Sequence, residues 1–239
     1  MKILVFDIWG DYGHFRKFYT TTSPLTFSFP PPSTIAGILG AIYGANKDEY
    51  LKFFSHDRCK TALKIVSNVK KVRMGINLIN TKGNYWQPVK KKNHEPRTQI
   101  RTEFLKDPCF RIYVSHVDGK LFDRLEQNIK EHKSIYSVSL GLSELLADFR
   151  FKGIFDADQI TDGQLAELFT PISAINLQKN EIEIEANKKY FKEKMPIRMN
   201  PDRVVEIYDD MIYEPDGKTI KAQVKTYYKL ENGENITFF

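Results

Sequence analysis

The sequence predicts an α+β fold whose elements follow the order strand, helix, strand, strand, helix, strand. Residues 2–9 (KILVFDIW) and 109–117 (CFRIYVSHV) are rich in β-branched and aromatic residues, which is typical of buried strands. Residues 33–46 and 119–133 carry apolar or small residues at helical spacing between such runs. This order is that of a ferredoxin-like domain, and we predict one over residues 1–160.

The first strand is expected to end at the turn residues 10–13, and residues 14–32 to form an ordered loop closed by three prolines. Ser33 or Thr34 is expected to cap the first helix. Small side chains along this helix would let it lie close to a sheet, so close packing is a sufficient reason for its glycines. No GxxxxGK[ST] motif accompanies them, so a nucleotide-binding loop is not indicated.

A protruding β-hairpin is predicted as an insertion at about residues 81–108, with the lysines 90–92 at its tip. Residues 61–80 before it are expected to form one long strand or two joined strands. The strand 109–117, a helix over 119–133 with one apolar face, and a strand over 149–155 complete the domain. RNA-recognition (RRM-like) domains share this arrangement.

Residues 161–239 are expected to form a small C-terminal antiparallel β region. Residues 181–185, 203–207 and 220–228 alternate apolar with charged side chains, and 214–217 (EPDG) is a turn sequence.

Positive charge is concentrated in one segment of the chain. The net charge is +6, but residues 60–111 hold thirteen Lys or Arg against three acidic residues, which leaves −4 for the remainder. Such a segment fits a binding site for a polyanion. Charge alone favours a solvated surface over a binding site. The 17 Phe and 12 Tyr fit either a β-rich core or base stacking.

Composition also excludes several classes of protein. Cys59 and Cys109 have neither metal-ligand spacing nor a disulfide framework, so we expect two small buried thiols in a reducing cytoplasm. The five histidines show no paired spacing, and no nucleophile motif is present, so neither a metal nor a cofactor is expected. No apolar run approaches the roughly 20 residues that span a bilayer, so a cytoplasmic location without membrane contact is expected.

A long and unusual string of residues extends from His14 to Ile42. It reads HFRK, TTTS, TF, FPPPST and GILGAI in order, and the stretches 140–147 (LGLSELLA) and 233–239 (GENITFF) agree with it. Together they resemble the fifth Cascade subunit family of CRISPR-associated proteins, in the repeat-associated mysterious protein (RAMP) superfamily. The resemblance covers essentially the whole chain, and within the family the sequence is most similar to the type I-B branch.

The resemblance implies an RNA-recognition-like domain with a thumb hairpin and a C-terminal β region. It also implies a function, as the RNA-binding subunit of a type I CRISPR Cascade surveillance complex in antiviral defence. Such a subunit holds the 5′ handle of the CRISPR RNA (crRNA), beside the Cascade backbone subunit and the Cascade large subunit.

Two groups of residues are candidates for RNA contact. On the hairpin, cations can neutralise phosphates, and two aromatic residues can stack on bases or seat the hairpin on its own core. In the loop after the first strand, Arg16 and Lys17 can reach RNA, or Arg16 can pair with Asp7 or Asp11. The hairpin candidates are Tyr85, Trp86, Lys90, Lys91, Lys92, Arg97 and Arg101.

The alternative is a metal-independent endoribonuclease that processes CRISPR repeat RNA, as the type I-C branch of the resembled family does. Lys92 and His94 would face one side of an extended strand, and Tyr43 could be the third member of a cleavage site. Against this, residues 93–96 (NHEP) have turn composition, and Tyr43 lies in the predicted helix. We therefore expect a binding subunit without a catalytic site.

Overall fold

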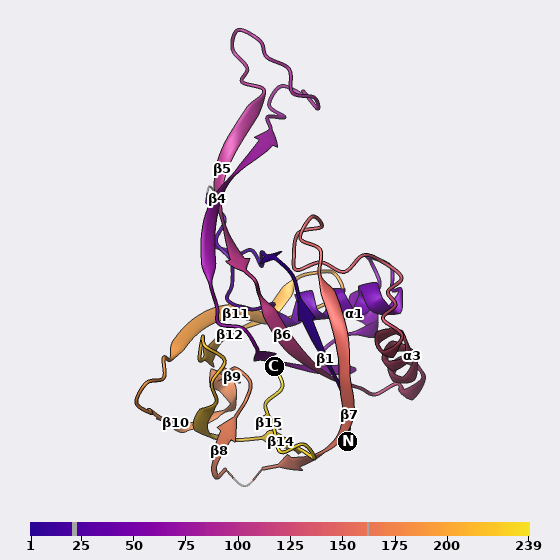
Figure 1. The fold of residues 1–239 in the computed structure, drawn as a ribbon, viewed down its shortest axis with the longest axis vertical. Helices are drawn as coiled ribbons and strands as arrows, with labels where there is room; N and C mark the ends of the chain where they lie inside the picture. Colours follow the sequence, from indigo (N-terminus) through magenta and orange to yellow (C-terminus); the bar gives the residue numbers. More distant parts are fainter. Residues whose placement is uncertain (21–22, 162) are drawn as a thin grey trace.

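A six-stranded antiparallel sheet forms the centre of the computed structural model, which describes residues 1–20, 23–161 and 163–239 (Figure 1). Its strand order is β15-β14-β7-β1-β6-β3. β1 lies between β6 and β7 and is antiparallel to both. The strands are β1 (Lys2–Trp9), β3 (Cys59–Ile65), β6 (Cys109–His116), β7 (Asp148–Ile160), β14 (Tyr227–Leu230) and β15 (Asn235–Ile236).

Helices α1 (Pro32–Tyr43) and α3 (Gly119–Lys130) follow β1 and β6 in the chain and pack on each other against the sheet. The short α2 (Tyr50–Phe53) packs on α1. Asp118 caps α3 by accepting hydrogen bonds from two backbone amides of the first turn. The chain thus runs through β1, α1, β3, β6, α3 and β7, and the predicted mixed α+β class is confirmed.

The prediction that Ser33 or Thr34 caps α1 is wrong. The helix begins at Pro32, and the residue before it, Pro31, makes no side-chain capping bond. Proline suits the first helical position because its fixed φ is already helical and its missing N–H needs no partner there. Only the first two prolines of the triplet therefore belong to the preceding loop.

A long hairpin of β4 (Lys71–Ile79) and β5 (Arg97–Lys106) projects away from the body (Figure 1). It therefore begins about ten residues before the predicted insertion at 81–108. The segment 61–80, expected to be one long strand or two joined strands, is divided between β3 of the large sheet and β4 of the hairpin. The short β2 (Tyr12–Gly13) pairs with the base of β5. The predicted tip is the loop 80–96 between the two strands.

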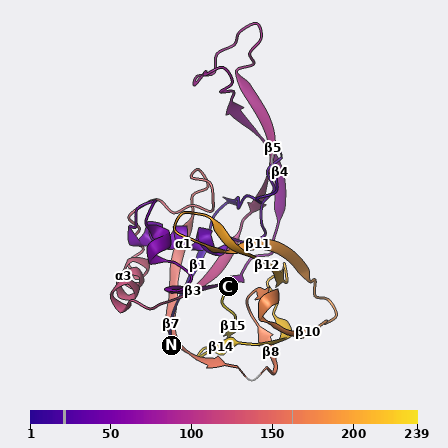
Figure 2. The same ribbon diagram turned by 180° about the vertical axis from the view of Figure 1, so that it is seen from behind.

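Residues 161–239 contribute to three sheets of the described chain (Figure 2). Two of these sheets have three strands each, and β14 and β15 instead complete the large sheet beside β7. A 3-10 helix, Ala174–Asn176, connects two of the strands. The first small sheet comprises β8 (Leu165–Leu168), β10 (Leu177–Glu183) and β13 (Ile220–Val224), and the second β9 (Ile172–Ser173), β11 (Phe191–Met199) and β12 (Val205–Tyr213).

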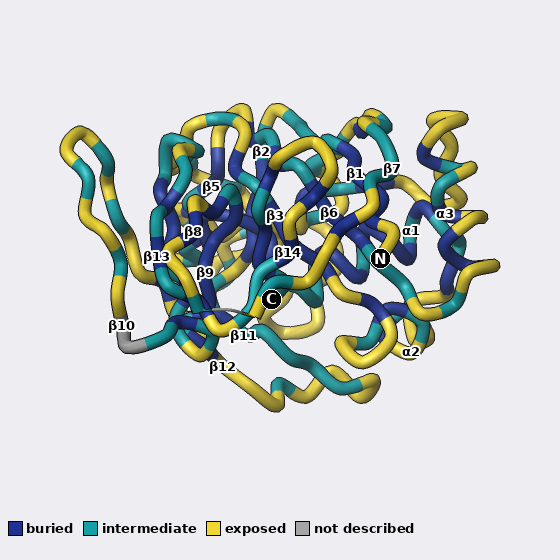
Figure 3. The backbone as a smooth tube through the Cα atoms, turned by 90° about the horizontal axis from the view of Figure 1, so that it is seen from below, coloured by how far each residue is buried: buried dark blue, intermediate teal, exposed yellow. Residues whose placement is uncertain are grey.

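The large sheet is buried on both faces near its centre (Figure 3). Leu4, Phe6 and Ile8 of β1 face the core beneath α1 and α3, whereas Ile3 and Val5 face a second cluster with β14 and β15. This alternation follows from the two-residue period of a strand. No described helix is long and apolar enough to cross a membrane.

Candidate nucleic-acid interface

The tip of the hairpin is a folded loop with its own small cluster. Lys91 and His94 exchange backbone hydrogen bonds of 3.2 and 3.1 Å, so residues 91–94 form the turn that their composition predicts. The Lys91 ammonium donates to the Tyr85 hydroxyl at 2.7 Å, and the Tyr85 and His94 rings lie 4.6 Å apart. Trp86, in contrast, is 76% exposed. Of the two aromatic candidates, Trp86 is therefore the one free to stack on a base.

The hairpin presents cations that no acidic side chain neutralises. Lys90, Lys92, Arg97 and Arg101 are exposed, and within the described ranges none of them makes an ion pair. Arg97 and Arg101 lie on the same face of β5 because they are four residues apart on a strand. We call these four exposed side chains, Lys90, Lys92, Arg97 and Arg101, the basic face of the hairpin.

Lys17 differs from these cations because it is already paired. Its ammonium is in an ion pair with Glu193 of β11, and its side chain is only 13% exposed. Burial lowers the pKa of Lys17, but the hydrogen bond and the charge of Glu193, together with Tyr19, outweigh that effect and raise it. The structure therefore places this predicted RNA contact inside the fold.

Arg16 is exposed, and its guanidinium donates to the Thr20 carbonyl at 3.1 Å. The alternative in which Arg16 pairs with Asp7 or Asp11 is wrong: Arg16 makes no ion pair within the described part of the chain, and Asp7 binds Arg111 at 2.8 Å and Lys152 at 3.5 Å. Arg16 thus remains accessible to a ligand.

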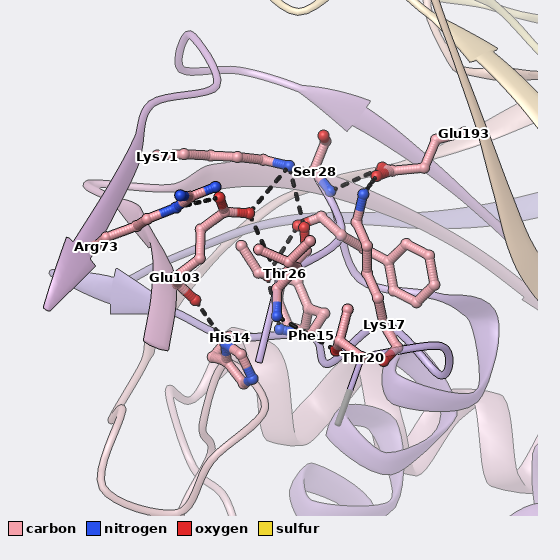
Figure 4. Close-up of polar contacts among 12 residues, drawn as sticks. His14, Phe15, Lys17, Thr20, Thr26, Ser28, Lys71, Arg73, Glu103 and Glu193 are labelled. Atoms are coloured by element: carbon pink, nitrogen blue, oxygen red, sulfur yellow. Dashed lines mark hydrogen bonds and ion pairs between the residues drawn. The ribbon is translucent and has the colours of Figure 1, made fainter. Parts of the chain in front are cut away.

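A polar network ties the loop 14–28 to the base of the hairpin (Figure 4). The Glu103 carboxylate lies 3.7 Å from the Lys71 ammonium and 3.4 Å from Arg73 Nε, and it accepts a 3.4 Å bond from the Thr26 amide. The Glu103 carbonyl lies 2.7 Å from His14 Nδ1. Burial lowers the pKa of Lys71, whose ammonium also donates to the Thr26 carbonyl at 3.0 Å.

The same loop is tied to the C-terminal β region. Glu193 accepts a 3.0 Å bond from the Ser28 amide, and the Ser28 and Tyr213 hydroxyls lie 2.7 Å apart. These bonds hold the hairpin base in one position on the body. Sequence reasoning missed Glu103 and Glu193 because a single acidic residue distant in sequence gives no spacing signal.

The three catalytic candidates are not brought together. Tyr43 lies in α1, where its ring packs 5.8 Å from Phe53 and beneath Arg124 at 4.8 Å. Lys92 and His94 lie in the loop at the hairpin tip, whereas α1 belongs to the body from which the hairpin projects (Figure 1). A cleavage site that uses Tyr43 with His94 is therefore incompatible with this arrangement.

Among the described residues, no group of three His, Cys, Asp or Glu side chains could hold a metal ion. Cys59 is buried, which raises the pKa of its thiol to about 12, and Cys109 is half-buried. The expectation of a buried thiol is confirmed for Cys59 and only partly met by Cys109.

Comparison with known proteins identifies the family. A model of the family described as CRISPR-associated protein (Cas_Cas5) matches residues 3–150. The chain belongs to this family. No curated protein sequence matches it at a significant level.

Two solved structures share the fold of this Cas5 family member. One is a CRISPR protein from Archaeoglobus fulgidus, 13% identical, with a TM-score of 0.55 and 98% of each chain covered. The other is a chain of a type III-B Cmr-beta complex bound to cognate target RNA and AMPPnP, 13% identical, with a TM-score of 0.51. That match covers 92% of this chain and 86% of the other. At such identities the likeness concerns the fold.

Proposed function

We propose that this Cas5 family member is the RNA-binding subunit of a type I CRISPR Cascade complex and holds the 5′ handle of the crRNA. The observation that carries the proposal is the set of unneutralised cations on a hairpin that projects from the body. Clustered Lys and Arg side chains supply most of the sequence-independent affinity of a protein for a phosphate backbone. Family membership and the resemblance to the type I-B branch support the same role.

The central fold supports this proposal. Strands β7-β1-β6-β3, with α1 and α3 as their connections, have the element order of a ferredoxin-like unit, an arrangement common to RNA-recognition domains. We assign the hairpin between β3 and β6 as the thumb of this unit.

The second face of the hairpin suggests how a neighbouring subunit is bound. Met74, Ile76, Leu78 and Ile100 lie on the face opposite Arg97 and Arg101, and Leu78 is 48% exposed. An apolar strip on a projecting hairpin is expected to be covered by another protein. We assign this apolar strip as the contact with the Cascade backbone subunit. We expect the Cascade large subunit to contact the body of the protein.

The test replaces Lys90, Lys91 and Lys92 together by alanine in the full chain. Binding of single-stranded handle RNA is measured by fluorescence anisotropy at several salt concentrations. We expect weaker binding and a salt slope flatter by about 2, because each phosphate contact on a single strand contributes about 0.7.

The matched control replaces three exposed lysines of the body, Lys47, Lys52 and Lys120, by alanine. The net charge change is the same, so a purely global charge effect would weaken binding equally. Unchanged affinity and slope in the hairpin variant would refute the proposal.

The second candidate function is a repeat-processing endoribonuclease. It is favoured by one observation: His94 Nε2 is buried without a hydrogen-bond partner among the described residues, beside a lysine two positions away. Incubation of the purified chain with repeat RNA in EDTA, followed by a denaturing gel, tests it. A single product that His94→Ala abolishes favours the enzyme, and intact RNA favours the binding subunit.

A further inference from the structure

Three aromatic side chains form a cluster on the surface of the body, at the base of the hairpin. The Phe18 ring lies 5.1 Å from Tyr19 and 4.8 Å from Tyr208 of β12. All three remain open to solvent, with exposed fractions of 52%, 57% and 39%. We call this group, Phe18, Tyr19 and Tyr208, the aromatic cluster.

The backbone beneath the cluster is held in place by the interactions of Lys17. This residue precedes Phe18 and is anchored to Glu193, and its ammonium lies 5.8 Å from the centre of the Tyr19 ring. The Thr20 hydroxyl donates to the Lys17 carbonyl at 2.9 Å, and Tyr208 belongs to a strand that pairs with β11. Exposed rings on a fixed backbone lose little conformational freedom when they bind a flat ligand.

The cluster is bordered by cations without an acidic partner among the described residues and by acidic residues that are paired. Arg16 uses one of its five donors for Thr20, and Lys194 lies on the same face of the β11–β12 pair as Tyr208. The acidic residues nearby are neutralised within the fold: Lys192 pairs with Asp210 at 3.0 Å and Arg198 with Glu206 at 3.0 Å. The border therefore favours a negatively charged ligand.

The loop that carries Phe18 and Tyr19 also contacts the base of the hairpin. The Glu103 amide of β5 donates to the Pro24 carbonyl at 2.9 Å, so the loop that carries Phe18 and Tyr19 runs beside the strand that carries Arg97 and Arg101. Figure 4 shows Lys17 and Thr20 of this loop next to the contact between Glu103 and Thr26. The Glu103 side chain, which accepts a bond from the Thr26 amide, lies on the same face of β5 as Arg97 and Arg101, so RNA bound along that face would extend toward this loop.

We propose that the aromatic cluster is a stacking site for unpaired bases of single-stranded RNA, with Arg16 and Lys194 on the adjacent phosphates. Exposed aromatic rings interleaved with cations are the usual platform for single strands, and every base offers a flat face to them. A protein partner would meet the same rings but would leave the two cations without a function. This inference rests on the proposed RNA-binding function and adds a second contact area to it.

The experiment uses the full-length chain and a short oligouridine RNA that carries 5-iodouridine. Irradiation links this base to an aromatic ring stacked on it, and mass spectrometry locates the link. We expect linked peptides that contain Phe18, Tyr19 or Tyr208. The double variant Phe18→Ala/Tyr208→Ala is expected to lose these links and to bind the RNA at least about tenfold more weakly, with an unchanged salt slope because no cation is lost.

Two further variants keep the result interpretable. Phe191→Ala removes another aromatic side chain of similar exposure, 50%, from β11 and is expected to bind normally. Phe18→Trp keeps a flat ring and is expected to keep both affinity and links. A thermal unfolding midpoint equal to that of the wild type shows that the double variant is folded. If the double variant is not folded, the affinity of Phe18→Trp and the positions of the links in the wild type test the inference instead.

The outcomes separate this inference from the proposed function. If the wild type binds RNA through Lys90, Lys91 and Lys92 but links form only on the hairpin, the inference is overturned and the proposed function stands. If the double variant binds RNA normally yet fails to join other Cascade subunits, the cluster is a protein contact and the inference is overturned. A wild type that binds no RNA overturns both.

Discussion

Cations around the base of the hairpin and cations near its tip have different surroundings. At the base, Lys17 is paired with Glu193, and Lys71 and Arg73 share Glu103. Towards the tip, Lys90, Lys92 and Arg97 are exposed and have no acidic partner among the described residues. Positive charge at the base therefore stabilises the fold, whereas positive charge at the tip is available for a ligand.

The largest effect on the free energy of unfolding is expected at the base of the hairpin, where the cations are paired. Lys17→Met leaves the Glu193 carboxylate, only 8% exposed, without its cation, and we expect a loss of about 3 kcal/mol in the free energy of unfolding. Urea denaturation measures it. Because the folded pKa of Lys17 is raised above 10.5, the wild-type contribution is present below that pH and is lost as the pH rises above it.

The matched control for Lys17→Met is its exposed neighbour. Arg16→Ala is expected to change the free energy of unfolding by no more than about 0.5 kcal/mol. Equal effects of the two substitutions would contradict the distinction between paired and unpaired cations.

A second, smaller effect is expected in acid. Burial raises the pKa of Glu234, but its bonds to the Lys64 ammonium at 2.7 Å and the Tyr113 hydroxyl at 2.8 Å outweigh this and hold it below 4.5. Its contribution, about 2 kcal/mol, is present above that pH and is lost as the pH falls below it.

Glu234→Gln tests this contribution. We expect the variant to be less stable than the wild type at neutral pH in urea denaturation and to lose less stability on acidification. A parallel decline of wild type and variant would show that other carboxylates account for the acid sensitivity.

The smallest effect on stability is expected on the hairpin. Arg97→Ala/Arg101→Ala removes two exposed, unpaired side chains, so the free energy of unfolding should change by no more than about 0.5 kcal/mol per residue. The same variant should bind single-stranded RNA more weakly, with a salt slope flatter by about 1.4. A loss of stability with unchanged RNA binding would show that these arginines stabilise the fold and do not bind RNA.

Local patterns in the sequence were sufficient for most of the fold. The run 2–9 matches β1 residue for residue, and the apolar spacing of 119–133 locates α3 to within three residues of its end. The hairpin itself was predicted, but its first strand was not separated from β3, because a strand that leaves one sheet for another keeps its alternating pattern.

The site was less predictable for a different physical reason. Exposed charges such as Lys90 and Lys92 are visible as a run, whereas the fate of Lys17 depends on Glu193, which lies far along the chain. The alternation around β12 did not reveal that Tyr208 meets Phe18, since ring contacts between distant segments leave no local pattern. Tyr43 was grouped with Lys92 and His94 by residue type alone, and the topology separates them.

The composition of the large sheet has a consequence for how the chain is made. Its centre is β1, from residues 2–9, but the edge beside β7 is completed by β14 and β15, from residues 227–236. During synthesis the outer edge of β7 is therefore unpaired until those residues leave the ribosome, and open strand edges are prone to aggregate. Chaperones that shield nascent chains are expected to engage this protein until residues 227–236 have left the ribosome.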